Sequence, residues 1–377
     1  MLEFLPEDWQ KAHLIGRIDF GDGPTPVAVR SGVLFDLSDI APTVAQLLEK
    51  PAGVQGGRAL GEIGNFDFRP AWDRPGKAQL LAPVDLQCIK AAGVTFAISA
   101  MERVIEERAR GDAGKAEAIR TALEKHIGSN LRACRPGSPE AARLKDAFIA
   151  DGLWSQYLEV AIGPDAEVFT KAPPLSSVGW GAEIGIRPDS SWNNPEPEIV
   201  VIVNRHGEAV GASLGNDVNL RDFEGRSALL LGKAKDNNAS CSIGPFIRLF
   251  DEHYTLDDVR NAEIELMVAG PDNYRLEGKS SMREISRDPL DLVRQTISQH
   301  QYPDGFALFL GTMFAPIQDR DVPGQGFTHK RGDVVQVSTP RLGRLENKVT
   351  HCNAAAPWNF GIADLMGNLA RRGLLKI

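Results

Sequence analysis

The stretch Asn194–Asp217 reads NPEPEIVVIVNRHGEAVGASLGND. Its apolar run Glu198–Val203 is followed by turn residues and by a second run, Ala209–Leu214, which is the pattern of a β-hairpin. If His206-Gly207 forms a two-residue loop, Arg205 pairs with Glu208. Each residue before Arg205 then pairs with one residue after Glu208, so the two ends of the stretch come together. The sequence therefore predicts that acidic residues near both ends meet at one end of the hairpin.

Three carboxylates lie at that end of the predicted hairpin. Glu196 and Glu198 are two residues apart, so on an extended segment they point to the same side. The hairpin register places Asp217 opposite Glu196, about 5 Å away. Three close carboxylates repel one another, and a hard divalent cation is the simplest compensation. All-oxygen ligands favour Mg²⁺, Ca²⁺ or Mn²⁺ over Zn²⁺; solvated acids at a hairpin end are the alternative.

The rest of the chain is rich in short strands. Runs such as Ala262–Val268, Phe306–Leu310 and Val334–Val337 are separated by frequent turns. This pattern favours an α+β fold with a mixed β-roll core over a doubly wound sheet. A Gly- and Pro-rich region before residue 85 suggests a small N-terminal β-rich domain, residues 1–84, followed by a larger domain, residues 85–377.

A helical excursion interrupts the strand pattern at residues 99–155. Apolar residues recur there at helical spacing, as in Met101, Val104 and Ile105. Ser138 is a candidate N-cap for a helix that starts with Pro139. We expect this excursion to be either a packed subdomain or a lid over the site.

Composition limits the classes of partner. The chain has 377 residues and a net charge of −8, which argues against nucleic acids and anionic membranes as partners. Its 4 cysteines are far apart, and no apolar run is long enough for a membrane span. Met1–Gln10 lacks the pattern of a signal peptide. We therefore expect a cytoplasmic protein.

Two lysines follow the acidic cluster. Lys233 and Lys235 come directly after the apolar run Ala228–Leu231, which favours partial burial. A lysine near a metal–carboxylate cluster can clamp an anionic substrate, carry a proton or form a Schiff base. The bland alternative for each is a solvated surface charge.

The combination of motifs resembles the fumarylacetoacetate hydrolase superfamily. The shared elements are Glu196-Pro-Glu198, the Asn-Asp-x-x-x-Arg-Asp segment from Asn216 to Asp222, a lysine ahead of Ala-Ser-Cys and Ile-Gly-Pro-Phe, and Gly311-Thr312. The resemblance implies a mixed β-roll in which Glu196, Glu198 and Asp217 bind Mg²⁺, with Mn²⁺ as a possible substitute. It also implies that Lys235 is the active-site lysine, and that Thr312 and Gly311 bind the substrate carboxylate.

One departure from the hydrolases concerns water activation. They carry a histidine, paired with a glutamate, shortly after a Gly-x-Asn-Tyr element. Here that element resembles Gly93-Val-Thr-Phe96, and the histidine position falls near Ser99. The resemblance therefore leaves Phe96 and Ser99 as candidate substrate-binding residues and puts hydrolysis in doubt.

The chain is more similar to a dehydratase branch of this superfamily. The similarity includes Glu167-Val-Phe-Thr-Lys171, Gly179-Trp-Gly181 and Trp192. It implies Glu167 and Lys235 as the acid/base pair in conversion of a 2-keto-3-deoxy sugar acid, such as 2-keto-3-deoxy-D-xylonate, to 2,5-dioxopentanoate. We expect a homodimer or homotetramer. The alternatives are a carbon–carbon bond hydrolase of diketo acids, and a metal-binding module without catalytic activity.

Overall fold

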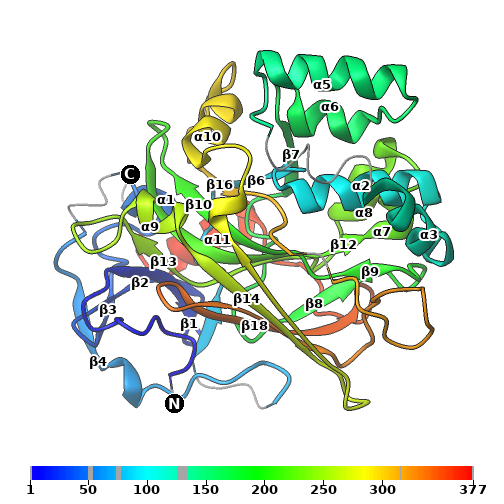
Figure 1. Ribbon diagram of the computed structural model, residues 1–377. Coiled ribbons are helices and arrows are strands. Elements are labelled where there is room, and N and C mark those ends of the chain that lie inside the picture. The colour runs from blue at the N-terminus through cyan, green and yellow to red at the C-terminus, as the bar shows by residue number, and fades with distance from the viewer. Residues whose placement is uncertain (1, 50–53, 74–77, 125–133, 315, 376–377) are drawn as a thin grey trace.

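The computed structural model describes residues 2–49, 54–73, 78–124, 134–314 and 316–375 (Figure 1). Most of the strands lie in two sheets, one of 11 strands and one of 5. Both sheets are mixed, because parallel pairs occur beside the antiparallel ones. The predicted α+β fold with a mixed β-roll core is therefore observed, and a doubly wound sheet is not.

The larger sheet runs through the centre of the molecule. Its path, from one edge to the other, is β4 (Arg58–Glu62), β3 (Val33–Asp36), β2 (Pro24–Arg30), β1 (Leu14–Asp19), β13 (Cys241–Leu249), β11 (Ala209–Asp217), β10 (Pro197–Val203), β16 (Phe306–Phe309), β6 (Cys88–Gly93) and β7 (Glu167–Ala172). A further strand, β5 (Gln79–Leu81), pairs with β1. The N-terminal strands thus continue the central sheet through the pairing of β1 with β13.

The smaller sheet covers one face of the larger one. Its order is β15 (Arg275–Ser281), β14 (Glu263–Ala269), β17 (Val334–Thr339), β18 (Gly343–His351) and β8 (Glu183–Ile186). Alternate residues of β10, such as Ile199 and Val201, pack with Leu266 and Val337 of the smaller sheet in one apolar core. The intervening residues Val200 and Ile202 belong to a second core on the opposite face. This alternation also decides on which face Glu198 of β10 lies.

The hairpin β10–β11 has the predicted ends but a different turn. Asn204, rather than Arg205, pairs with Glu208, because the backbone N–H of Asn204 donates to the carbonyl oxygen of Glu208. A register shift between Ile202 and Val203 compensates for the longer loop. The backbone N–H of Asp217 donates to the carbonyl oxygen of Glu196 at 3.0 Å, so the predicted opposition of these two residues is confirmed.

The helices of the excursion gather on one side of the molecule (Figure 1). The excursion contains α2 (Ala97–Ala109), α3 (Ala113–Glu124), α5 (Pro139–Ala150) and α6 (Gln156–Ile162), so it continues beyond the predicted end at residue 155. Ser138 caps α5 as predicted, accepting a hydrogen bond from the backbone N–H of Ala141. Residues 125–133 of the excursion lie outside the described residues.

The remaining elements are short. They are β9 (Asn193–Asn194) and β12 (Asn219–Leu220), which pair with each other, and the helices α1 (Val44–Leu47), α7 (Arg221–Glu224), α8 (Leu231–Lys235), α9 (Leu256–Arg260), α10 (Pro289–Ile297) and α11 (Ile362–Arg371). Among the described residues, no helix combines the length and apolar character that crossing a membrane requires.

Candidate active site

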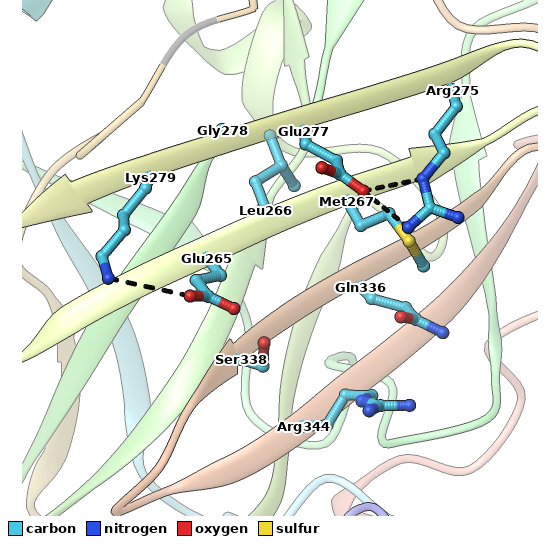
Figure 2. A pocket seen from close by; sticks show the side chains of 10 residues that line it. All are labelled: Glu265, Leu266, Met267, Arg275, Glu277, Gly278, Lys279, Gln336, Ser338 and Arg344. Atoms are coloured by element: carbon cyan, nitrogen blue, oxygen red, sulfur yellow. Dashed lines mark hydrogen bonds and ion pairs between the residues drawn. The ribbon is translucent and has the colours of Figure 1, made fainter.

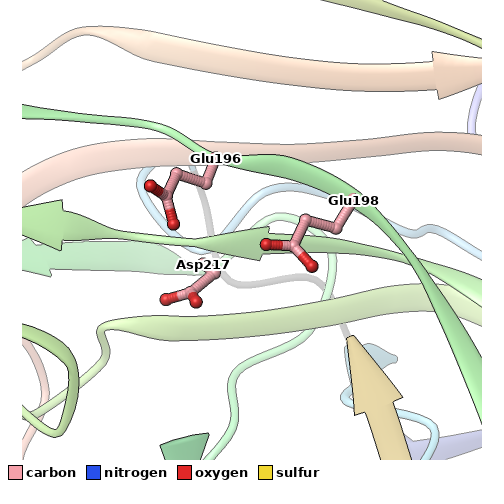
Figure 3. Close-up of side chains that lie close together, drawn as sticks. All are labelled: Glu196, Glu198 and Asp217. Carbon is pink, nitrogen blue, oxygen red and sulfur yellow. The ribbon is translucent and has the colours of Figure 1, made fainter. Parts of the chain in front are cut away.

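The three predicted carboxylates converge at the open end of the β10–β11 hairpin (Figure 3). Glu196, Glu198 and Asp217 each offer a ligand atom, and these atoms lie within 4.8 Å of one another. All three residues are buried, with at most 2% of their surface exposed. The alternative interpretation as solvated hairpin-end acids is therefore wrong. Oxygen donors at this spacing fit a hard divalent cation.

The chain holds one oxygen of each carboxylate from outside the cluster. Arg103 donates from Nη2 to Oε1 of Glu196 at 2.7 Å. The Nζ atom of Lys171, a fully buried lysine, lies 3.0 Å from Oδ1 of Asp217. The backbone N–H of Gly311 donates to Oε2 of Glu198 at 2.6 Å. The second oxygens of Glu196 and Asp217 meet at the centre of the cluster, and the second oxygen of Glu198 lies 3.5 Å from the Thr312 hydroxyl.

Lys235 lies at that centre. Its Nζ atom donates to Oε2 of Glu196 and, at 3.2 Å, to Oδ2 of Asp217. Burial favours the neutral amine, but Asp217 and Glu196 outweigh it and raise the pKa of Lys235 above its ordinary value. The competing candidate Lys233 is exposed, and its Nζ atom lies over the Phe223 ring. The structure therefore brings Lys235, and not Lys233, to the acidic cluster.

The pKa of Glu198 reflects the crowding of the three carboxylates. Burial, followed by repulsion from Asp217 and Glu196, raises the pKa of Glu198 well above its ordinary value. By contrast, the pKa of Glu196 is lowered to about 2, because Lys235 and Arg103 outweigh its burial. A divalent cation among the three carboxylates would stabilise the ionised form of Glu198 as well. The donor set thus fits the Mg²⁺ that the family resemblance implies.

Glu167, at the start of β7, faces the same space. Burial raises its pKa above the ordinary value of a glutamate. A Cβ atom at Gly93, its neighbour on β6, would lie 2.0 Å from Oε2 of Glu167. A side chain at position 93 would therefore displace this carboxylate from its observed place.

A single pocket joins the predicted residues. It is lined by Ala92, Gly93, Val94, Ser99, Arg103, Glu167, Phe169, Glu196, Glu198, Asp217, Glu224, Lys235 and Thr312. Side chains nearly fill it, leaving a cavity of about 10 Å³. The hydroxyl of Ser99 is engaged with the backbone of Phe96, as a helix cap. Phe96 itself is buried in the core and lines a neighbouring cavity, so the structure does not place its side chain in the pocket.

Two charged residues of the pocket were not among the site residues predicted from the sequence. Arg103 and Glu224 line the pocket and form an ion pair of 3.0 Å. Burial, and repulsion from Glu196 and Glu106, raise the pKa of Glu224 to about 7 despite the attraction of Arg103 and Lys235. Helical periodicity identifies apolar faces, and it carries no signal that charged residues share the buried face of α2.

A larger hollow lies on the outer face of the smaller sheet (Figure 2). It measures about 430 Å³ and is lined by side chains of β14, β15, β17 and β18. Its charged residues pair with one another, as in Arg275 with Glu277 and Lys279 with Glu265. The hollow is open and contains no convergent acidic cluster, so the triad pocket remains the candidate site.

Comparison with known families agrees with this geometry. Residues 155–350 match the family described as fumarylacetoacetate (FAA) hydrolase C-terminal. The matched range contains the whole triad, Lys235 and Thr312. The chain belongs to the fumarylacetoacetate hydrolase family.

Curated relatives lie in the dehydratase branch of the family. A probable 2-keto-3-deoxyxylonate dehydratase of Haloferax volcanii is 31% identical over 211 residues, which cover 56% of this chain and 68% of the relative. A 2-dehydro-3-deoxy-D-arabinonate dehydratase of Saccharolobus solfataricus is 30% identical over 182 residues, which cover 48% of this chain and 57% of the relative. Both names denote hydro-lyases, so the chain is an enzyme of this family related to its dehydratases.

Solved structures show the same fold. A 2-keto-3-deoxy-D-arabinonate dehydratase complexed with magnesium and 2,5-dioxopentanoate superposes with a TM-score of 0.63. The superposition covers 90% of this chain and 99% of the other, at 19% identity. A fumarylacetoacetate hydrolase from Exiguobacterium antarcticum gives a TM-score of 0.54 at 16% identity. At these identities the comparison establishes the fold.

Proposed function

We propose that the chain is a Mg²⁺-dependent dehydratase that converts 2-keto-3-deoxy-D-xylonate to 2,5-dioxopentanoate and water. The observation that carries the proposal is the convergence of Glu167 and Lys235 on the pocket of the acidic triad. Neither a metal-binding module nor a structural site needs two further ionisable groups there. The names of the curated relatives support the same reaction and substrate.

Glu196, Glu198 and Asp217 would hold the ion. A Mg²⁺ ion held there would supply a Lewis acid for a keto oxygen next to a carboxylate, and the C3 protons beside that keto group would become more acidic. Thr312 lies at the pocket wall, where its hydroxyl, 3.5 Å from Oε1 of Glu198, can donate to the substrate carboxylate. Gly311 is fixed beside it by its own N–H bond to Glu198.

Glu167 and Lys235 would move the protons. One of them takes a proton from C3, and the other protonates the C4 hydroxyl as it leaves with the C–O electron pair as water. The resulting C3–C4 enone loses a proton from C5 and gains one at C3, which moves the double bond to C4–C5. The enol formed then becomes the aldehyde of the product. In the metal-free chain Asp217 and Glu196 raise the pKa of Lys235, and burial raises the pKa of Glu167, so both groups favour their protonated forms there.

The direct test uses purified protein, Mg²⁺ and 2-keto-3-deoxy-D-xylonate. We expect 2,5-dioxopentanoate to accumulate, identified by NMR, and we expect EDTA to stop the reaction until Mg²⁺ or Mn²⁺ is restored. An unchanged substrate spectrum in the presence of Mg²⁺ would overturn the proposed substrate. The same compound is also called 2-keto-3-deoxy-D-arabinonate. Its L enantiomer, which has the opposite configuration at C4, is tested in parallel and measures how strictly the pocket selects stereochemistry.

The second candidate is hydrolysis of a diketo acid, the reaction suggested by the name of the wider family. Within the described part of the chain, no histidine lines the pocket, and Ser99 stands near the position expected for the water-activating one. Acetylpyruvate tests this candidate, because its hydrolysis releases acetate and pyruvate. We expect neither product above the rate without enzyme.

A further inference from the structure

Arg103 connects the helical excursion to the acidic triad. It lies in α2, with 8% of its surface exposed, and donates from Nη2 to Oε1 of Glu196 at 2.7 Å. The other oxygen of Glu196, Oε2, faces Lys235 at the centre of the cluster. The two oxygens of this carboxylate are thus divided between two cations on different sides.

The guanidinium of Arg103 is itself held in place. Its Nη1 donates to Oε2 of Glu106 at 2.6 Å and lies 3.0 Å from Oε2 of Glu224. Glu106 is fixed in turn by Arg221, whose Nε lies 3.0 Å from Oε1 of Glu106. These residues come from α2 and α7, so the fork of Arg103 is oriented from two elements before any ligand binds.

We propose that Arg103 is a positioning residue that holds Glu196 as a one-oxygen metal ligand. By occupying Oε1, it prevents the carboxylate from rotating away or from binding the ion through both oxygens. Groups that orient a ligand in this way typically contribute 10- to 100-fold to metal affinity. The inference rests on a metal at the triad and does not depend on which reaction the enzyme performs.

Simple electrostatics predicts the opposite effect for the same residue. Arg103 is a cation beside a cation site, so removing its charge would strengthen binding of Mg²⁺ if only Coulomb repulsion mattered. Positioning predicts that removal weakens binding. The sign of the change therefore separates the two roles.

The experiment is titration calorimetry of the full chain with MgCl₂ alone. We expect Arg103→Met to raise the Kd by about 10- to 100-fold and Arg103→Lys to give a smaller rise, because lysine keeps the charge without the fork. Arg120→Met is the matched control. Arg120 lies in α3 and pairs with Glu102 and Glu117, with no contact to the triad, so its Kd should stay near that of the wild type.

The outcomes remain distinct if Arg103→Met folds poorly. The Arg103→Met change leaves Glu224 without its ion-pair partner, and adding Glu224→Gln removes this buried negative charge. We expect the same rise in Kd from this double variant. A Kd that is unchanged or lower in the folded variants overturns the positioning role. A wild-type protein that binds no Mg²⁺ overturns the metal assignment of the proposed function, and with it this inference, whereas bound metal without dehydration leaves the inference standing.

Discussion

A Cβ atom at Gly93 would lie 2.0 Å from Oε2 of Glu167, closer than two such atoms can approach. Position 93 pairs with position 167 across β6 and β7, so the two residues cannot move apart without breaking the sheet. We expect Gly93→Ala to displace the Glu167 carboxylate and to lower kcat by about 10²-fold, the scale of losing a positioned proton-transfer group.

The control for this variant is its metal affinity. Gly93 lies outside the acidic triad, so calorimetry should give a Kd for Mg²⁺ close to that of the wild type. Gly93→Ala should also resemble Glu167→Ala in its kinetics. If Gly93→Ala turns over normally while Glu167→Ala does not, the packing of these two residues has no role in catalysis.

Glu198 makes the metal affinity depend on pH. Because the pKa of Glu198 is raised in the folded, metal-free protein, the folded state keeps a proton at pH values where the unfolded chain has lost it. The free energy of unfolding of the protein therefore falls as pH rises through that pKa. Mg²⁺ requires the ionised carboxylate, so its stabilising effect grows over the same range.

Thermal melts with EDTA and with Mg²⁺ across a pH series test this linkage. We expect the increase in Tm caused by Mg²⁺ to be small at low pH and to grow as pH rises. Glu198→Gln should abolish most of this increase, whereas Glu277→Gln, on the exposed sheet face, should keep it. An increase in Tm that is independent of pH would contradict the role of Glu198.

Lys235 and Glu167 should act as a pair. We expect Lys235→Ala and Glu167→Ala each to lower kcat by about 10²-fold or more, because each removes a proton-transfer group. The double variant should lose little beyond the worse single variant, since residues that act as a unit are not additive. Exposed Lys233 supplies the control, and Lys233→Ala should remain near wild type.

Steady-state kinetics on the four variants gives the coupling directly. Effects of Lys235→Ala and Glu167→Ala that multiply in the double variant would show independent roles. Full activity in both single variants would show that proton transfer uses other groups, and Glu224, which also lines the pocket, is a candidate.

Much of the triad could be predicted because strand geometry is regular. The two-residue period fixes the common side of Glu196 and Glu198, and antiparallel pairing fixes Asp217 opposite Glu196. The loop is one residue longer than predicted, and a register shift between Ile202 and Val203 restores the predicted pairing beyond it. Short-range pairing rules therefore reached the metal ligands even though the loop was wrong.

The supporting cations could not be predicted in this way. Arg103 and Lys171 reach the triad from α2 and β7, and no periodicity relates those elements to the β10–β11 hairpin. Their burial depends on tertiary packing, which places each buried charge beside a charge of the opposite sign. A sequence pattern reports the face of a helix, and it does not report which distant residue that face meets.

The helical excursion should change its motion when ligand binds. Ser99 and Arg103 of α2 line the pocket, yet the cavity that the side chains leave is only about 10 Å³. A five-carbon sugar acid needs more space, so we expect α2 to move outward for entry and to close afterwards, which excludes water from the reacting carbons.

Hydrogen exchange measured by mass spectrometry should then show slower exchange in α2 with Mg²⁺ and 2,5-dioxopentanoate than in the ligand-free protein. Strands β14 and β15 of the smaller sheet serve as the internal control and should exchange equally in both states. Equal protection of α2 with and without ligand would show that this helix is a fixed wall of the pocket, and that substrate enters by another route.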